Sequence, residues 1–162
     1  MPILPQLQEL LDREGVRYEI SHHPPAYTAQ QVAQAEHVPG REFAKVVVIR
    51  SSAGFALFVA PAPYKVDLER VRAILGDAQA RLATEDEFRH LFPRCEVGAM
   101  PPFGNLFGLP VFVDPELSRD ESIVFNAGSH TQTVRMRYAD FERLVQPTVV
   151  TFAHKEQTPK QS

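Results

Sequence analysis

The sequence predicts an α/β protein whose single domain holds a mixed, mostly antiparallel curved sheet with flanking helices. The 162 residues, of which 44% are hydrophobic, are enough for one ordinary globular domain and too few for two. Fourteen prolines divide the chain into short elements, because each proline fixes φ and removes a backbone donor. Expected strands outnumber expected helices and have short connections, which favours antiparallel pairing. We expect the domain to span residues 1–153, followed by a polar tail over residues 154–162.

Helix and strand signals alternate through the first half of the chain. Apolar residues recur at helical spacing, and Thr28 with Gln31 and Thr84 with Glu87 have the spacing of capping boxes. Two β-branched and aromatic runs flank a short turn that ends in glycine, which is typical of a hairpin. The expected elements, in chain order, are a helix at 7–11, a strand at 16–20, a helix at 29–37, hairpin strands at 43–49 and 55–60, and helices at 67–75 and 84–91.

The second half reads as a glycine- and proline-rich loop followed by short strands. The loop spans 98–108, and its glycines and prolines exclude regular structure over most of its length. The elements expected after it are strands at 110–114, 122–125 and 132–136, a helix at 138–144 and an edge strand at 149–152. Residues 154–162 are polar enough to form a frayed tail.

Charge and cysteine content exclude several classes of protein. Seventeen Lys and Arg against twenty Asp and Glu give a net charge of −3, which excludes a generally basic nucleic-acid coat. A single cysteine, Cys95, excludes an internal disulfide framework and a cysteine-rich zinc site. The N-terminus has no basic leader, and no apolar run approaches membrane-spanning length. We therefore expect a soluble cytoplasmic protein.

Three polar or glycine-rich places stand out in apolar surroundings. Lys45 interrupts a strand that otherwise looks buried, so its ammonium group must reach water or an anion. The run from Gly98 to Asn105 is stiffened by two prolines, so that its backbone amides can face a ligand. His130 follows a glycine turn and precedes a strand, where side chains commonly line sites.

Three other groups of residues could suggest a metal site or a nucleophile, but a structural role explains each of them more simply. His22 and His23 diverge in extended backbone, so they fit a structural loop better than a metal site. Ser129 and His130 are neighbours and point to opposite sides, which excludes a nucleophile and base pair. Cys95 has no glycine elbow or helix N-terminus of its own, which favours an inert thiol.

Together these features resemble a known family. The Lys45 strand, the loop Gly98-Ala99-Met100-Pro101-Pro102 and the segment at 125–130 occur in the order seen in the YbaK/EbsC family. Its members are free-standing relatives of the bacterial prolyl-tRNA synthetase editing domain. The resemblance covers about residues 16–152 and implies the YbaK-like fold, a mixed and mostly antiparallel sheet with flanking helices. It also implies a trans-editing aminoacyl-tRNA deacylase, which hydrolyses the ester of a mischarged tRNA without ATP.

The resemblance further implies which residues form the site. Lys45, Gly98 and His130 match the family's lysine, its Gly-x-x-x-Pro loop and the histidine of alanine-editing members, so we expect them to be catalytic. Val46 departs from the polar residue that often follows this lysine in alanine-editing members. No metal or other cofactor is expected. The substrate-binding residues expected around the catalytic three are Ala99, Met100, Pro101, Pro102, Phe103, Gly128 and Ser129.

Elementary chemistry indicates how such a site would act. Lys45 would repel the substrate's α-ammonium group, so its expected partner is a phosphate or the ribose of the terminal adenosine. Backbone donors in the 98–103 loop would stabilise the oxyanion, while His130 shapes the pocket or binds water. The family is thought to use the tRNA's own terminal 2′-hydroxyl to activate the water. The proline-rich wall is expected to exclude side chains larger than Ala, Ser or Thr.

The expected substrate is a tRNA mischarged with a small amino acid. Ala-tRNA(Pro) leads, with Ser, Thr and Cys as further possibilities. The net charge of −3 confines recognition to the acceptor end, with Arg41, Lys45, Arg135 and Arg137 as the local basic patch and a synthetase or elongation factor as a helping partner. Two alternatives stay open, a non-catalytic module that binds an amino acid or nucleotide and a thiol hydrolase that uses Cys95.

Overall fold

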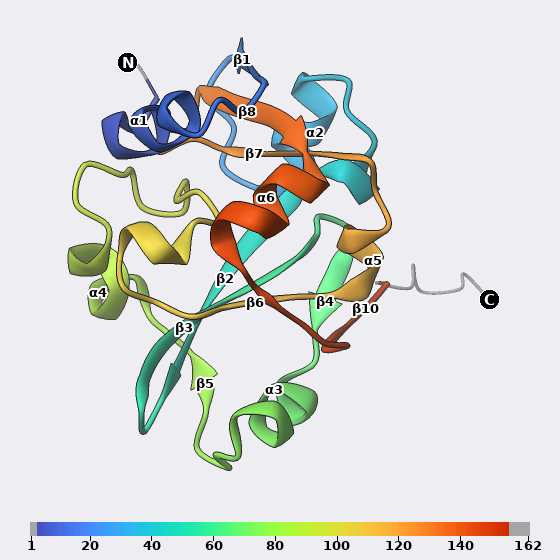
Figure 1. The fold of residues 1–162 in the computed structure, drawn as a ribbon. Coiled ribbons are helices and arrows are strands. Elements are labelled where there is room, and N and C mark those ends of the chain that lie inside the picture. Colours follow the sequence, from blue (N-terminus) through green and yellow to red (C-terminus); the bar gives the residue numbers. More distant parts are fainter. Residues whose placement is uncertain (1–2, 156–162) are drawn as a thin grey trace.

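Most elements of the computed structural model, which describes residues 3–155, lie where the sequence signals predict them (Figure 1). The capping boxes at Thr28 and Thr84 both form, and Asp67 caps the helix after it. The predicted elements are found as α1 Pro5–Arg13, β1 Tyr18–His22, α2 Ala29–Ala35, β2 Ala44–Ser51, β3 Gly54–Pro61, α3 Leu68–Leu75, α4 Glu85–Phe88, β6 Val111–Val113, β7 Ser122–Asn126, β8 Gln132–Arg137 and α6 Tyr138–Val145.

Several short elements escape the sequence signals. They are the 3-10 turns η1 Gly40–Glu42, η2 Arg89–Leu91 and η3 Gly104–Leu106, the strands β4 Tyr64–Val66, β5 Arg81–Leu82, β9 Thr148–Val149 and β10 Ala153–Lys155, and the helix α5 Pro115–Ser118. The helix expected at 84–91 is thus divided into α4 and η2. Strands and helices of two to four residues show too little periodicity for a pattern to detect.

The C-terminal expectations need two corrections. An edge strand at 149–152 was expected, but pairing stops after Val149 and resumes only at Ala153. Between them Phe152 is fully buried, and the Asp114 carboxylate accepts hydrogen bonds from the backbone N–H groups of Phe152 (3.1 Å) and Ala153 (2.9 Å). The frayed tail was also placed too early, because residues 154 and 155 belong to β10. The rest of that expected tail, residues 156–162, lies outside the described residues.

The strands of the described chain form three sheets, which confirms the mixed, mostly antiparallel architecture. The largest has the order β5-β2-β3-β6-β9, the second β1-β8-β7, and β10 pairs with β4. β2 and β3 form the predicted antiparallel hairpin, whereas β3 with β6 and β6 with β9 run parallel. A parallel bridge between Phe43 and Val124 links the start of β2 to β7, so the two larger sheets meet there.

The β2–β3 pair separates two hydrophobic cores. Ala44 and Val48 of β2 face the main core, to which α1 and α6 also contribute buried side chains. Ile49 faces a second core beneath α3, where Phe58 and Phe152 pack edge to face. Because neighbouring strand residues point to opposite faces, Lys45 lies on the side of the second core.

Candidate functional site

Three loops meet at the end of the β1-β8-β7 sheet, and we call residues 23–27, 96–100 and 127–131 the three-loop site. Backbone hydrogen bonds connect them. The N–H of Glu96 donates to the Gly128 carbonyl (2.8 Å), the N–H of Gly128 to the Ala99 carbonyl (2.9 Å), and the N–H of Ala26 to the His130 carbonyl (3.3 Å). The site is therefore held by main chain, which fixes its shape independently of most side chains.

His130 has the most informative side chain in the three-loop site. Its ring is buried, and Nε2 lies 2.8 Å from the Val97 carbonyl oxygen. A carbonyl only accepts hydrogen bonds, so Nε2 carries the proton and Nδ1 of the neutral ring is an acceptor. Nδ1 is buried and has no hydrogen-bond partner in the described part of the chain. The exposed ring of Tyr27 packs 4.8 Å from the His130 ring and forms the outer wall.

Gly98 borders His130 and faces solvent. A Cβ atom at Gly98 would lie 3.5 Å from His130 Cε1, and its φ of +86° is a conformation that residues with a side chain rarely adopt. Its N–H donates to Met100 Sδ at 3.3 Å, and a thioether sulfur is a weak acceptor. This amide can therefore turn from the sulfur to a stronger acceptor, such as the oxyanion of a reacting ester.

The predicted substrate-binding residues divide between the site and the core. Gly128 and Ser129 lie in the three-loop site next to His130, where Ser129 Oγ is 3.3 Å from Thr131 Oγ1. Ala99 and Met100 also belong to the three-loop site, but their side chains are buried, and Pro101, Pro102 and Phe103 after them are buried as well. Phe103 packs between Phe125 and Phe141 in the main core, so it supports the loop from below and offers no exposed wall.

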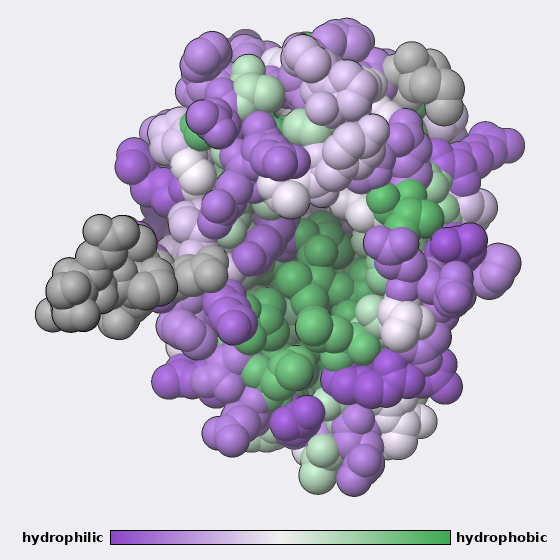
Figure 2. Space-filling model, turned by 180° about the vertical axis from the view of Figure 1, so that it is seen from behind, coloured by the Kyte–Doolittle hydropathy of each residue, from purple (hydrophilic) through white to green (hydrophobic). Residues whose placement is uncertain are grey.

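Lys45 approaches from another element. It is half-buried in β2 opposite Ala60, on the face that also carries Val47. From behind, Figure 2 shows an apolar hollow in the middle of the molecule, ringed by hydrophilic side chains.

The basic patch expected from sequence is partly neutralised. Arg135 pairs with Glu42 at 3.2 Å, and Arg41 lies 4.0 Å from the same carboxylate. Arg137 is exposed at the end of β8. Glu42 of η1 thus pairs with two of the side chains that were expected to bind phosphate. The sequence pattern alone could not reveal these ion pairs.

Cys95 does not have the character of a nucleophile. Burial raises the pKa of its thiol to about 11. A thiol with that pKa is protonated near neutrality, and the thiolate is the reactive form. This environment argues against the thiol-hydrolase alternative and favours the inert thiol predicted from sequence.

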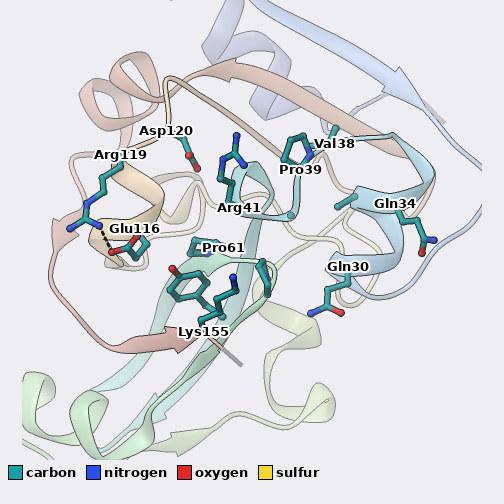
Figure 3. A pocket seen from close by; sticks show the side chains of 14 residues that line it. Gln30, Gln34, Val38, Pro39, Arg41, Pro61, Glu116, Arg119, Asp120 and Lys155 are labelled. Atoms are coloured by element: carbon teal, nitrogen blue, oxygen red, sulfur yellow. Dashed lines mark hydrogen bonds and ion pairs between the residues drawn. The ribbon is translucent and has the colours of Figure 1, made fainter. Parts of the chain in front are cut away.

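A large cavity lies elsewhere and was not predicted (Figure 3). It has a volume of about 710 Å³ and lies between α2, η1, α5 and the end of β10, so we call it the α2–α5 cavity. Arg41, Arg119 and Lys155 bring positive charge to it, and Glu116 and Asp120 negative charge. The sequence could not reveal this grouping, because the fold brings these charged side chains together from three separate segments.

The ionised carboxylate of Asp120 is in an unfavourable environment in the α2–α5 cavity. Burial, and to a smaller extent the charges of Glu42 and Glu116, raise the pKa of its carboxyl to about 6, while Arg41 lowers it. Its Oδ2 is buried without a hydrogen-bond partner among the described residues. The folded protein therefore binds a proton here more readily than the unfolded chain.

Asp120→Asn is expected to stabilise the protein above pH 6 and to make little difference near pH 4. A raised acid pKa means that stability is lost as pH rises through the folded-state value. We expect a gain of about 1 kcal/mol at pH 7.5, reduced from the full shift because solvent screens this half-buried group. Urea unfolding at pH 4, 6 and 7.5 measures it, and an unchanged difference across this range would contradict the assignment.

Comparison with known proteins decides the family. The model that describes the aminoacyl-tRNA editing domain matches residues 23–144. The chain belongs to the aminoacyl-tRNA editing domain family. This confirms the family resemblance read from the Lys45, Gly98 and His130 segments. All three loops of the three-loop site fall within the matched residues.

The names of individual relatives agree with this family assignment. The editing-domain chain is 29% identical over 152 residues to the multifunctional Ser/Thr-tRNA deacylase ProXp-y of Escherichia coli (strain K12), covering 91% of this chain and 90% of that protein. It is 30% identical over 81 residues to a proline–tRNA ligase of Thermosipho africanus, which is 50% of this chain and 14% of the ligase.

Solved structures confirm the editing-domain fold. A protein assigned as a trans-editing enzyme for prolyl tRNA synthetase superposes with a TM-score of 0.81 at 24% identity, over 96% of this chain and 100% of that one. The hypothetical protein APE2540 gives a TM-score of 0.82 at 18% identity, over 92% and 99%. In residues 3–155, no group of three His, Cys, Asp or Glu side chains is placed to hold a metal ion. Within the same range, no helix is both long and apolar enough to cross a membrane.

Proposed function

We propose that this editing-domain protein is a trans-editing deacylase that hydrolyses tRNA mischarged with a small amino acid, at the three-loop site. One observation carries the proposal. The buried, unpartnered Nδ1 of His130 lies beside the solvent-facing backbone of Gly98, whose N–H is bound only to a weak acceptor. An acceptor for a proton and a donor for an oxyanion are the two groups that ester hydrolysis requires.

The proposed reaction uses these groups in sequence. A water oxygen forms a bond to the ester carbonyl carbon while His130 Nδ1 accepts a hydrogen bond from that water. The Gly98 N–H leaves the Met100 sulfur and donates to the developing oxyanion. The bond to the terminal ribose oxygen then breaks, that oxygen takes the proton that the attacking water gave up to His130 Nδ1, and the free amino acid and intact tRNA are released. The terminal 2′-hydroxyl that the family resemblance implies would assist the water.

Tyr27 is suited to hold the terminal adenine. Its ring is 69% exposed although it contacts His130, so one face remains open to solvent. Stacking of a base on such a ring is worth about 1–3 kcal/mol and would place the ester over His130. Sequence analysis missed this residue, and the only signal was an aromatic side chain directly before the Thr28 cap.

Among small amino acids, we propose Ser and Thr ahead of Ala. The E. coli relative that matches 91% of this chain is named for Ser/Thr-tRNA. Ser129 Oγ and Thr131 Oγ1, which lie 3.3 Å apart in the loop that carries His130, can bind a substrate hydroxyl, which Ala lacks. Ala-tRNA(Pro), favoured by the His130 resemblance, remains the competing substrate, and one methyl or hydroxyl group is worth only about 1–3 kcal/mol in such a pocket.

His130→Ala is expected to lower the rate constant of deacylation at least tenfold on every substrate, because it removes the group that holds the attacking water. The measurement is a panel of Ser-, Thr-, Ala-, Cys- and Phe-tRNA on several tRNAs, with Cys95→Ser as the matched control that leaves the profile unchanged. Wild-type rates in His130→Ala, or loss of activity in Cys95→Ser, would overturn the assignment. Rapid hydrolysis of Phe-tRNA would refute the small-substrate part.

A further inference from the structure

We propose that the α2–α5 cavity binds a nucleotide of the single-stranded acceptor end of tRNA, with its phosphates near Arg41, Arg119 and Lys155 and an amino-bearing base at Asp120. This inference rests on the proposed function, because it gives the same substrate a second point of attachment. It assigns a role to a large cavity that the hydrolysis scheme does not use.

The charges of the cavity suit a phosphodiester. Three cations line it, and Figure 3 shows Arg41 and Lys155 on different sides of the space, with Arg119 turned toward Glu116. The Arg41 guanidinium is mostly exposed, and its ion pair with Glu42 is long at 4.0 Å. It can therefore exchange this partner for a phosphate, and such charge-assisted contacts are among the stronger hydrogen bonds.

The other walls suit a base. Asp120 presents a carboxylate whose Oδ2 is buried and unpartnered, and a carboxylate accepts from an exocyclic amino group such as cytosine N4. Pro63 and Tyr64 supply apolar surface, and the amides of Gln30 and Gln34 belong to the lining from α2. The raised pKa of Asp120 fits this reading, because a donor would relieve a carboxylate that now has none.

Helix α2 connects the cavity to the three-loop site. Tyr27, which contacts His130, directly precedes the Thr28 cap, while Gln30 and Gln34 of the same helix line the cavity. Seven helical residues rise about 10 Å in total. A strand of a few nucleotides along this short helix can thus place its terminal adenosine at Tyr27 and a preceding nucleotide in the cavity. A volume of about 710 Å³ lies in the usual range of small-ligand sites and is enough for a single nucleotide.

Fluorescence anisotropy with uncharged RNA hairpins tests the inference. The probes are an acceptor-stem hairpin ending in single-stranded CCA, the same hairpin with UUA, and a blunt hairpin. We expect Arg41→Ala and Arg119→Ala each to weaken binding of the CCA hairpin at least fivefold. Asp120→Ala should abolish the preference for CCA over UUA. Arg70→Ala, which removes an exposed arginine of α3, is the matched control and should bind like wild type.

The outcomes separate this inference from the proposed function. Equal binding of CCA and blunt hairpins by wild type, or wild-type binding by all cavity variants, would overturn the cavity assignment even if the protein hydrolyses aminoacyl-tRNA. If His130→Ala binds the CCA hairpin normally and cavity variants do not, the cavity assignment holds whatever the deacylation panel shows. Deacylation assays of Arg41→Ala should show a raised KM with little change in kcat.

Discussion

Lys45→Met is expected to reduce deacylation at least tenfold while leaving the fold intact. Methionine keeps an unbranched apolar stem of similar length but removes the charge, so packing in β2 is preserved. Losing a charge-assisted contact to a phosphate or ribose group costs about 1.5–3 kcal/mol, which is tenfold or more in rate. Lys45→Arg should recover part of the activity because it restores the charge.

The position of Lys45 makes this a demanding test. Lys45 is half-buried on the β2 face opposite Ala44 and Val46, and its role in the site rests on the family resemblance. Deacylation kinetics and thermal unfolding of Lys45→Met should be compared with those of Lys65→Met, an exposed lysine of β4. Full activity in Lys45→Met would show that the charge of this lysine is not needed for the reaction.

Gly104→Ala is expected to destabilise the protein by about 2–3 kcal/mol, near the upper end of overpacking effects. A Cβ atom at this position would lie 2.4 Å from the Leu109 carbonyl oxygen and 2.6 Å from Val111 Cγ2. Backbone cannot move aside as a flexible side chain can, so the loop that contains Phe103 must shift. Deacylation should fall as well, because the same loop presents Gly98.

Urea unfolding measures this effect, with Gly40→Ala as the control. A Cβ at Gly40 meets only the ring of Pro63, at 3.3 Å, so that substitution should cost much less. Equal stabilities of the two variants would mean that the turn at η3 relaxes freely and that the tight approach of Leu109 has no energetic weight.

The elements that could be predicted are those with enough residues to show a pattern. The β2–β3 hairpin, the capping box at Thr28 and the helix closed by Gly76 each carry a local chemical signal, and each is found. The partners of the C-terminal strands could not be predicted. β9 and β10 have two and three residues, and they pair with β6 and β4 because Phe152 and Asp114 fix the chain between them.

The residues of the candidate site also divide into those that the sequence could predict and those that it could not. Gly98 and His130 lie 32 positions apart, and glycine chemistry together with a family resemblance placed both in one site, where the structure brings them into contact. The burial of Phe103 and the exposure of Tyr27 could not be predicted, because aromatic residues in loops have no periodicity that assigns them to a face. Nor could the α2–α5 cavity, which depends on how four segments pack.

The placement of Phe152 also constrains how the protein can be made. Its ring fills the second core against Phe58, and β9 and β10 complete two sheets, yet these residues are synthesised after every other strand and helix of the described chain. Until they emerge, the nascent chain holds an open apolar face and unpaired strand edges, which are the features that promote aggregation during synthesis. A stop codon near residue 147 should therefore give an insoluble product although every residue of the three-loop site has been translated.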